Sequence, residues 1–317
     1  GPRVALEIGL SYRGLAHYWQ TRYEATEADC VEALEVATEL GDGFYALAAR
    51  MFLGLSRANL GRLSEALDDF SDAIAIARRN DDRYWMPRLV SHLGWVHREL
   101  GALARAREHD AEALLLARER PLWGPEAEVL LNLCVDDVRE GRAGQASALL
   151  AELQARVAGS PWLRWLNELR LAAATAEHWA ARGEYGRADE EAARLAGIAA
   201  RLGSLDYRCG AERIRGEAAL ECGRDVGAAA ERLDAALAPL RSTPAPLEAW
   251  RSARVLALLR RRLGDDGAER AAFADAARAV HTIAAGLRDD ALRAGFLGLA
   301  EVREILAAVG APFPPGG

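Results

Sequence analysis

The chain has 317 residues, of which 51% are hydrophobic, 27% charged and only 7% aromatic. Alanine and leucine dominate, which is typical of helices rather than strands. The formal net charge of −7 argues against a nucleic-acid partner, because such a partner requires a dense basic face. All forty basic residues are arginine, and this lysine-free, alanine-rich composition indicates GC-rich coding and a bacterial source.

The N-terminus and the cysteines favour a cytoplasmic fragment of a longer protein. Residues 1–2, Gly-Pro, look like the scar of a cleaved tag, so Arg3 would begin the native segment. No apolar run approaches the roughly 18 residues of a membrane helix, and no secretory signal is visible. The cysteines show no metal-type spacing, which favours a reduced setting; they are Cys30, Cys134, Cys209 and Cys222.

A repeat of about 40 residues runs along the chain. Its most regular mark is a glycine that closes a helical stretch, at Gly61, Gly101, Gly141, Gly183, Gly223 and Gly264. A small residue stands seven positions before each of them, at Gly54, Gly94, Cys134, Ala176, Gly216 and Ala257. One interval further back, Gly14, Thr21 and Ala33 mark a degenerate first repeat.

Each repeat is predicted to be an antiparallel pair of helices. A glycine after a helix takes the left-handed conformation that ends it, and small residues let the two helices pack closely. The pairs are predicted to begin near residues 4, 44, 84, 125, 165, 207 and 247. One pair cannot bury both apolar stripes, so the prediction is an all-α solenoid of about seven repeats over residues 3–285. A capping helix from Asp289 or Asp290 to about Val309, and a tail, would fill residues 286–317.

The columns resemble the tetratricopeptide repeat (TPR) family, whose pattern is W-x2-L-G-x2-Y, then G, then A-x3-F-x2-A. The matching positions are Leu53-Gly54, Gly61, Ala66, Phe70 and Ala73, then Leu93-Gly94, Gly101, Ala106 and Ala113. The period is near 40 rather than 34, as in the C-terminal repeat region of large bacterial multidomain signalling ATPases and transcriptional regulators. The resemblance implies a right-handed α-solenoid that acts as a sensor or scaffold.

No residue set predicts an enzyme, a metal site or a cofactor. Adjacent carboxylates such as Asp136-Asp137 point about 100° apart on a helix and do not share one site. The six histidines form no ligand-spaced pair, and a P-loop is excluded because lysine is absent. Asp137 falls in a column that is usually aromatic, and we expect it to form a structural salt-bridge ladder with His97 and Arg57.

The leading helices are expected to line a concave groove that binds a partner. Its predicted residues are Tyr12, Trp19, Met51, Phe52, His92, Trp95, Arg98 and Arg139. Aromatic and methionine side chains suit an apolar anchor of a peptide or helix, and the two arginines would flank it and fix a carboxylate. The alternative is that these aromatics only pack between repeats, the role expected of Trp85, Trp123, Trp162 and Trp165.

The sequence therefore predicts a non-catalytic protein-interaction or effector-sensing solenoid from a larger bacterial regulator. Its partner would be a protein, a peptide or an upstream domain of its own chain, and neither nucleic acid nor a membrane. The alternative hypothesis is a stand-alone peptide-binding receptor of the pheromone type. An enzyme would need a deep pocket with convergent polar groups, which no motif indicates.

Overall fold

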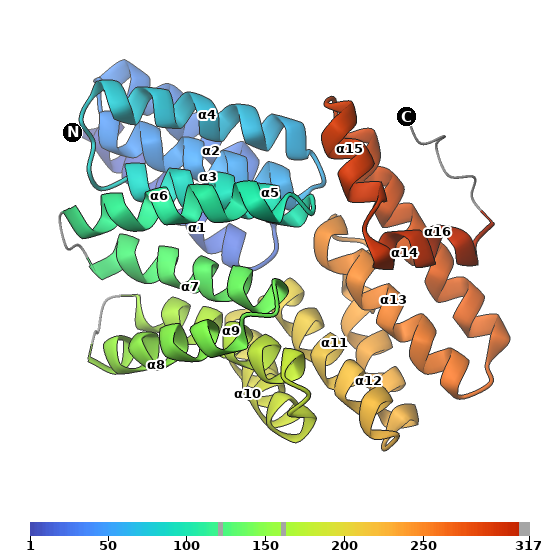
Figure 1. The fold of residues 1–317 in the computed structure, drawn as a ribbon. Helices are drawn as coiled ribbons and strands as arrows, with labels where there is room; N and C mark the ends of the chain where they lie inside the picture. The colour runs from blue at the N-terminus through green and yellow to red at the C-terminus, as the bar shows by residue number, and fades with distance from the viewer. Residues whose placement is uncertain (120–122, 160–162, 311–317) are drawn as a thin grey trace.

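The computed structural model describes residues 1–119, 123–159 and 163–310, and in these ranges it contains α-helices, one short 3-10 helix and no strand. Fourteen of the helices form seven consecutive antiparallel pairs (Figure 1). The pairs are α1 (Pro2–Trp19) with α2 (Tyr23–Leu40), α3 (Gly43–Asn59) with α4 (Leu63–Arg79), α5 (Met86–Glu99) with α6 (Leu103–Glu119), α7 (Trp123–Arg139) with α8 (Ala143–Gly159), α9 (Arg164–Ala181) with α10 (Tyr185–Leu202), α11 (Leu205–Cys222) with α12 (Val226–Leu237), and α13 (Pro246–Arg262) with α14 (Asp266–Ala285). A 3-10 helix, η1 (Ala238–Arg241), extends α12. The predicted all-α repeat solenoid is confirmed.

The glycine column ends the leading helices as predicted. Gly61 has a φ of 82° and Gly264 a φ of 74°, and the four column glycines between them also have positive φ. Every predicted pair begins within two residues of its predicted start. The small residues of the second column allow close helix packing. At Gly54, for example, an added Cβ would lie 2.8 Å from Cζ of Phe70 on the facing helix. Successive leading helices also contact one another and form the inner layer of the solenoid.

The solenoid closes on itself through contacts between the first and the sixth repeats. Thr21 stands at the glycine position of the first repeat and adopts a φ of 62°, which a β-branched residue rarely takes. Its hydroxyl accepts hydrogen bonds from the backbone N–H groups of Leu205 and Asp206 and donates one of 2.7 Å to the Asp206 carboxylate. Tyr23 donates a second hydrogen bond of 2.6 Å to the same carboxylate. Thr21 thereby caps α11, whose own N-cap Ser204 makes no side-chain cap bond.

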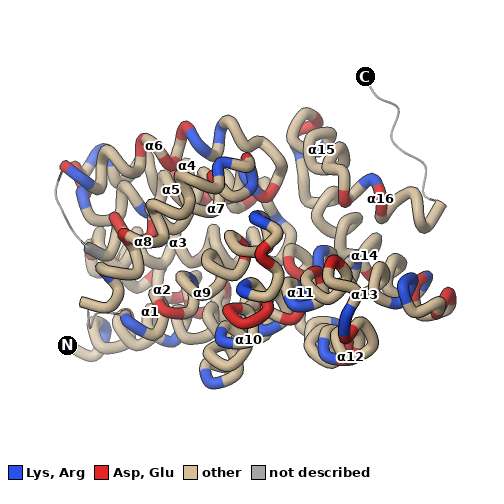
Figure 2. Tube along the Cα trace, turned by 60° about the horizontal axis from the view of Figure 1, so that its bottom comes forward, with Lys and Arg blue, Asp and Glu red and all other residues tan. Residues whose placement is uncertain are grey.

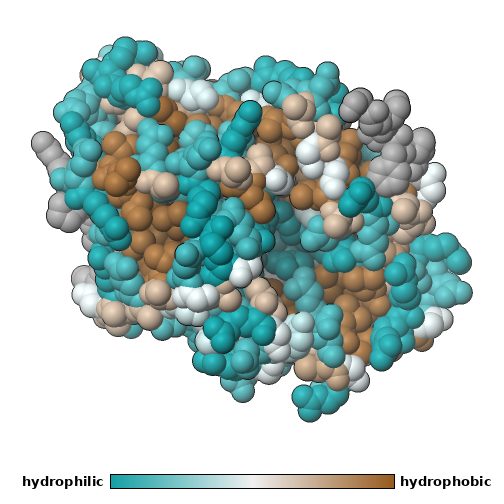
Figure 3. Space-filling model, viewed as in Figure 1, coloured by the Kyte–Doolittle hydropathy of each residue, from teal (hydrophilic) through white to brown (hydrophobic). Residues whose placement is uncertain are grey.

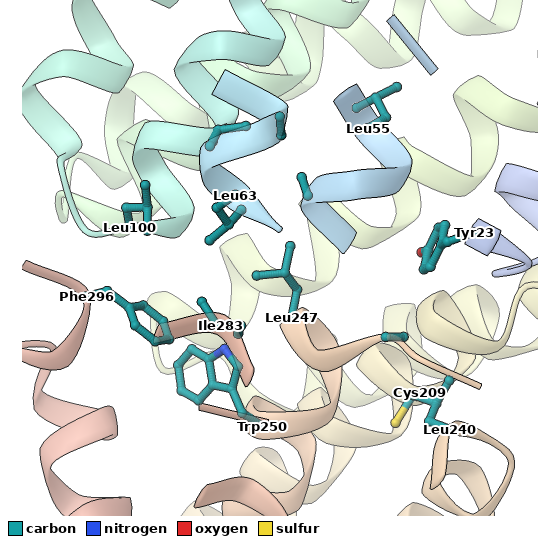
Figure 4. Close-up of a cluster of buried hydrophobic side chains, with 14 of the residues drawn as sticks. Tyr23, Leu55, Leu63, Leu100, Cys209, Leu240, Leu247, Trp250, Ile283 and Phe296 are labelled. Atoms are coloured by element: carbon teal, nitrogen blue, oxygen red, sulfur yellow. The ribbon is translucent and has the colours of Figure 1, made fainter. Parts of the chain in front are cut away.

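A second closing contact joins repeats two and three to the C-terminal helices. Leu63 and Leu100 face Ile283, Trp250 and Phe296 in one buried cluster (Figure 4). The backbones approach so closely that a Cβ on Gly286 would lie 2.6 Å from the carbonyl oxygen of Gly61. A hydrogen bond and an ion pair also connect these parts of the chain. The backbone N–H of Arg288 donates to Ser64, and the guanidinium of Arg251 pairs with Glu99.

Closure also shows in the surface area. The accessible surface is 13671 Å², only slightly above the ~12,900 Å² expected for a globular protein of this mass.

Basic and acidic residues are interspersed over the helices rather than gathered on one face (Figure 2).

The prediction of a single C-terminal capping helix is wrong. The capping segment forms two short helices, α15 (Asp290–Leu297) and α16 (Ala300–Ala308), instead of one. Asp289 caps the first as predicted, but Gly298 ends it, and the bend lets Phe296 and Val302 both be fully buried. The predicted tail at residues 311–317 lies outside the described residues.

Asp137 is a structural ion-pair residue, but with partners other than those predicted. It accepts hydrogen bonds from Arg107 and Arg142, at 2.8 and 2.9 Å. Arg57 instead pairs with Glu27 and Asp69, and the ring of His97 stacks on that of His109 with centroids 5.3 Å apart. Asp137 and the other two residues of this column therefore contact the trailing helices and the turn beside them rather than each other.

Replacing Asp206 by alanine tests the first closing contact. The change leaves the buried hydroxyls of Thr21 and Tyr23 without their acceptor, and we expect it to destabilise the fold by about 2 kcal/mol or more. The melting temperature, followed by circular dichroism, should fall by about 4 °C or more. Asp72→Ala, at an exposed carboxylate, is the matched control and should leave the melting temperature unchanged. Equal melting temperatures for the two variants would contradict the role of Asp206.

Candidate functional site

The closed solenoid encloses a cavity of about 520 Å³ on the inner side of its leading helices. The space-filling surface is hollowed near the middle of the molecule, where the N-terminal and C-terminal repeats meet (Figure 3). All eight residues predicted for the groove line this cavity: Tyr12, Trp19, Met51, Phe52, His92, Trp95, Arg98 and Arg139. The structure therefore brings the predicted residues together, in one cavity that is open to solvent on part of its surface.

The first three repeats supply an aromatic wall. Tyr12 and Phe44 are 58% and 45% exposed, an unusual degree for large apolar rings. Trp95 is half-buried, whereas Met51 and Phe52 are buried and also belong to the hydrophobic core. The rim residues and Trp95 are thus free to contact a ligand, while the deeper pair contributes both to the core and to the cavity wall.

Trp19 joins this wall to the opposite side of the cavity. Its ring lies 5.0 Å from that of Tyr18, 6.2 Å from that of Trp165 and 6.1 Å from that of Tyr207. Trp165 accordingly packs between repeats as predicted. The contacts place the aromatic wall directly beside the Thr21 contact that closes the solenoid, because Thr21 follows Trp19 by two residues.

The third to seventh repeats supply a charged wall in which arginines and carboxylates alternate. Glu128 on α7 accepts hydrogen bonds from Arg88 on α5 and Arg170 on α9, and lies 3.0 Å from Nε2 of His92. Burial alone would raise the pKa of Glu128, but His92, Arg170 and Arg88 outweigh it and hold that pKa well below the usual range. The predicted residue His92 is therefore part of a structural ion network.

The same alternation continues around the cavity. Arg213 on α11 pairs with Glu177 on α9 at 3.3 Å and with Glu248 on α13 at 3.1 Å. Burial would raise the pKa of Glu99, but Arg251, together with other arginines, lowers it to about 2. Glu99 is thus ionised at neutral pH and holds α5 to α13 across the closing contact.

The two arginines predicted to fix a carboxylate differ. Arg98 is 3% exposed, donates a hydrogen bond of 2.8 Å to Asp136 and lies 3.8 Å from Asp110. Its charge is already neutralised inside the protein. The side chain of Arg139 is 29% exposed, and within the described part of the chain its one ion pair is to Glu99, at the long distance of 3.7 Å. Of the two, Arg139 is the one available to a ligand.

Sequence reasoning missed several cavity residues at the first turns of the leading helices. Phe44-Tyr45 and Tyr84-Trp85 stand one repeat apart, and Asp206-Tyr207 and Leu247-Glu248 are their counterparts in later repeats. The 40-residue register was the signal that could have identified these residues.

Trp85, predicted to be only structural, is buried and lines the cavity, whereas Trp162 and the side chain of Trp123 lie outside the described residues. The charged leading-helix residues after residue 170 that line the cavity are Glu177, Asp206, Arg213, Glu248 and Arg251, whereas Arg254 pairs with Glu304 of α16.

Within the described residues, no group of three or more His, Cys, Asp or Glu side chains is placed to hold a metal ion. None of the helices there combines the length and the apolarity needed to cross a membrane.

Comparison of the sequence with protein-family models and with curated proteins finds no match. Solved structures do match. A Rap protein complexed with competence and sporulation factor aligns with a TM-score of 0.63 at 13% identity, over 98% of this chain and 87% of the other. NprR in complex with its cognate peptide NprX aligns with a TM-score of 0.58 at 13% identity, over 96% and 88%. The fold is a TPR-type repeat solenoid. A tetratricopeptide repeat protein from Parabacteroides merdae aligns with a TM-score of 0.48 at 13% identity, over 96% and 99%.

Trp95→Ala, compared with Trp250→Ala, tests whether the cavity aromatics are ligand-facing or core residues of the TPR-type solenoid. Trp250 is 3% exposed in the closing cluster, and its truncation should cost about 3–5 kcal/mol of unfolding free energy. Trp95 is half-buried, so we expect a loss of about 2 kcal/mol or less. Urea unfolding measures both values. If the two losses are equal, Trp95 is a core residue and the cavity wall has only a packing role.

Proposed function

We propose that this TPR-type solenoid is a non-catalytic effector sensor that binds a short peptide in its partly enclosed cavity. The observation that carries the proposal is the pairing of two unlike walls. Most of the aromatic side chains that line the cavity come from the first three repeats, and its arginines and carboxylates come from the third to the seventh. An extended peptide also combines apolar and polar parts. Its apolar side chains need burial, which the aromatic residues offer, and its backbone groups need hydrogen-bond partners, which the charged residues offer.

The size and shape of the cavity favour a short ligand over a large partner. Its volume of about 520 Å³ is within the range of ~300–1,000 Å³ typical of small-molecule and cofactor sites. A long helix laid along the concave face would have to displace the contact of Arg251 with Glu99 and that of Thr21 with Asp206. These contacts support a peptide or effector that the superhelix surrounds.

The structural neighbours agree with this proposal at the level of the fold. The Rap protein and NprR have the same helical solenoid, and each was solved in complex with a peptide or factor. We propose the same class of ligand here, and that the chain acts in the bacterial cytoplasm as the sensing part of a larger regulator. A stand-alone peptide receptor is the alternative, and the full-length sequence would distinguish the two.

The charged residues of the cavity support binding rather than catalysis. Glu128 and Glu99 are held ionised by the arginines around them, and Glu248 is bonded to Arg213 and Ser252. A general acid or base has to exchange a proton with its substrate, and carboxylates fixed in ion pairs are unsuited to that role.

A cavity-filling substitution tests the proposed function. Ala173 lines the cavity from α9 and is half-buried, so that Ala173→Trp places an indole inside. Short random peptides displayed on phage would be selected on the unaltered protein, and their affinities measured for each variant. We expect selected peptides to bind Ala173→Trp and Trp95→Ala about tenfold or more weakly. Ala151→Trp, at an exposed position of α8, is the control and should bind them normally. Failure to select any peptide, or equal binding by Ala173→Trp, would refute a cavity-bound peptide.

A further inference from the structure

Charged side chains line much of the cavity. Six of them are arginines and five are carboxylates. The arginines are Arg88, Arg98, Arg139, Arg170, Arg213 and Arg251, and the carboxylates are Glu99, Glu128, Glu177, Asp206 and Glu248. Because Asp136, outside this lining, neutralises Arg98, the bonding of each arginine, rather than the total charge, decides where an anion can bind.

Five of the six arginines are already bonded to an acidic side chain. Arg88 and Arg170 donate to Glu128, Arg98 to Asp136, Arg213 to Glu248, and Arg251 to Glu99. Arg139 is the exception, because it donates no hydrogen bond to any residue that the structure describes. Its nearest carboxylate oxygen, on Glu99, is 3.7 Å away and belongs to a group that Arg251 already occupies.

The surroundings of Arg139 compensate its charge only in part. Glu99 and Glu177 favour that charge, whereas Arg251 and Arg98 oppose it, and Glu99 is shared among the three arginines. Burial, together with these arginines, lowers the pKa of Arg139. A guanidinium in such a place gains from any anion that enters the cavity, since charge-assisted hydrogen bonds to arginine are among the strongest in proteins.

The helical register sets where the anion would lie relative to the aromatic wall. Trp95 and Glu99 are four residues apart and share one face of α5, and Val135 and Arg139 share the equivalent face of α7. All four residues line the cavity. A ligand with its apolar body against Trp95 and Val135 would place an attached anion one helical turn further along, at Arg139.

We propose that Arg139 is the specificity-determining residue of the cavity and selects ligands that carry an anionic group, a carboxylate first of all, on an apolar body. The inference rests on the proposed binding function and specifies its ligand class. The carboxylate has two sources in a peptide, the C-terminus and an acidic side chain. Both present the same two oxygens to a guanidinium.

Two fluorescent probes of similar shape separate charge recognition from apolar binding. The first, 8-anilinonaphthalene-1-sulfonate, is an anion, and the second, N-phenyl-1-naphthylamine, is uncharged. We expect Arg139→Gln to raise the dissociation constant of the anionic probe about tenfold or more, the loss of one charge-assisted hydrogen bond. The constant for the uncharged probe should change less than about twofold. Arg139→Lys should restore most of the affinity for the anion, because it keeps the charge.

Arg224→Gln is the matched control, since Arg224 is exposed and outside the cavity. Competition then distinguishes the two carboxylate sources. N-acetyl-tryptophan carries a terminal carboxylate, acetyl-aspartyl-tryptophan amide a side-chain carboxylate, and acetyl-tryptophan amide neither. Stronger displacement by either acid than by the amide, lost in Arg139→Gln, supports the proposal and identifies the source.

The outcomes of this experiment separate the two proposals. If both probes bind and Arg139→Gln weakens both equally or neither, anion selection is refuted while cavity binding stands. If Arg139→Gln lowers only the melting temperature, Arg139 merely stabilises the C-terminal end of α7, and the inference is again refuted. If neither probe binds the unaltered protein, both the proposed function and the inference fail.

Discussion

The contact between the first and the sixth repeats determines the form of the whole molecule. Three groups meet there: the hydroxyls of Thr21 and Tyr23, which are almost fully buried, and the carboxylate of the half-buried Asp206. A solenoid stabilised only by neighbouring repeats presents its leading helices as an open concave face. Here the hydrogen bond between Thr21 and Asp206, which are 185 residues apart in the sequence, joins the first repeat to the sixth. The enclosed cavity, and with it the proposed function, follows from that closure.

The closure illustrates how a locally unfavourable residue is retained. A left-handed conformation at a β-branched residue costs roughly 1–2 kcal/mol, and glycine at position 21 would avoid it. Glycine, however, has no hydroxyl to cap α11 and bond Asp206. The apolar cluster around Trp250 and Phe296 adds the larger, non-directional part of the closing free energy, because it removes several large side chains from water at once. The polar contact fixes the geometry, and the apolar cluster supplies most of the stability.

Much of the fold was predictable because a repeat encodes the same local geometry several times. Glycines and small residues at fixed positions specify helix ends and close helix packing, so the seven pairs and their starts follow from the register alone. The eight groove residues followed from the same register, which assigns each position of a leading helix to the inner or outer side. Whether they bind a ligand stays a prediction.

Contacts across the closure were not predictable, since no local pattern relates Thr21 to Asp206 or Glu99 to Arg251. Thr21, which replaces the column glycine, marks an exception to the repeat pattern, but the sequence does not identify Asp206 as its partner. The same limit separated Arg98 from Arg139. Both lie on leading helices, but only the three-dimensional arrangement shows that Asp136 neutralises Arg98 and that Arg139, among the described residues, makes only a long ion pair with Glu99. A column identifies the inward-facing residues, and the neighbouring helices decide what those residues can bind.

Small-angle X-ray scattering of the chain in solution tests the closure most directly. A closed solenoid of 317 residues should have a radius of gyration of about 20 Å, the value for a compact globular protein of that length. The distribution of interatomic distances should be single-peaked and nearly symmetric. A clearly larger radius with a long tail in that distribution would show an open superhelix, and would contradict both the closing contacts and the enclosed cavity that depends on them.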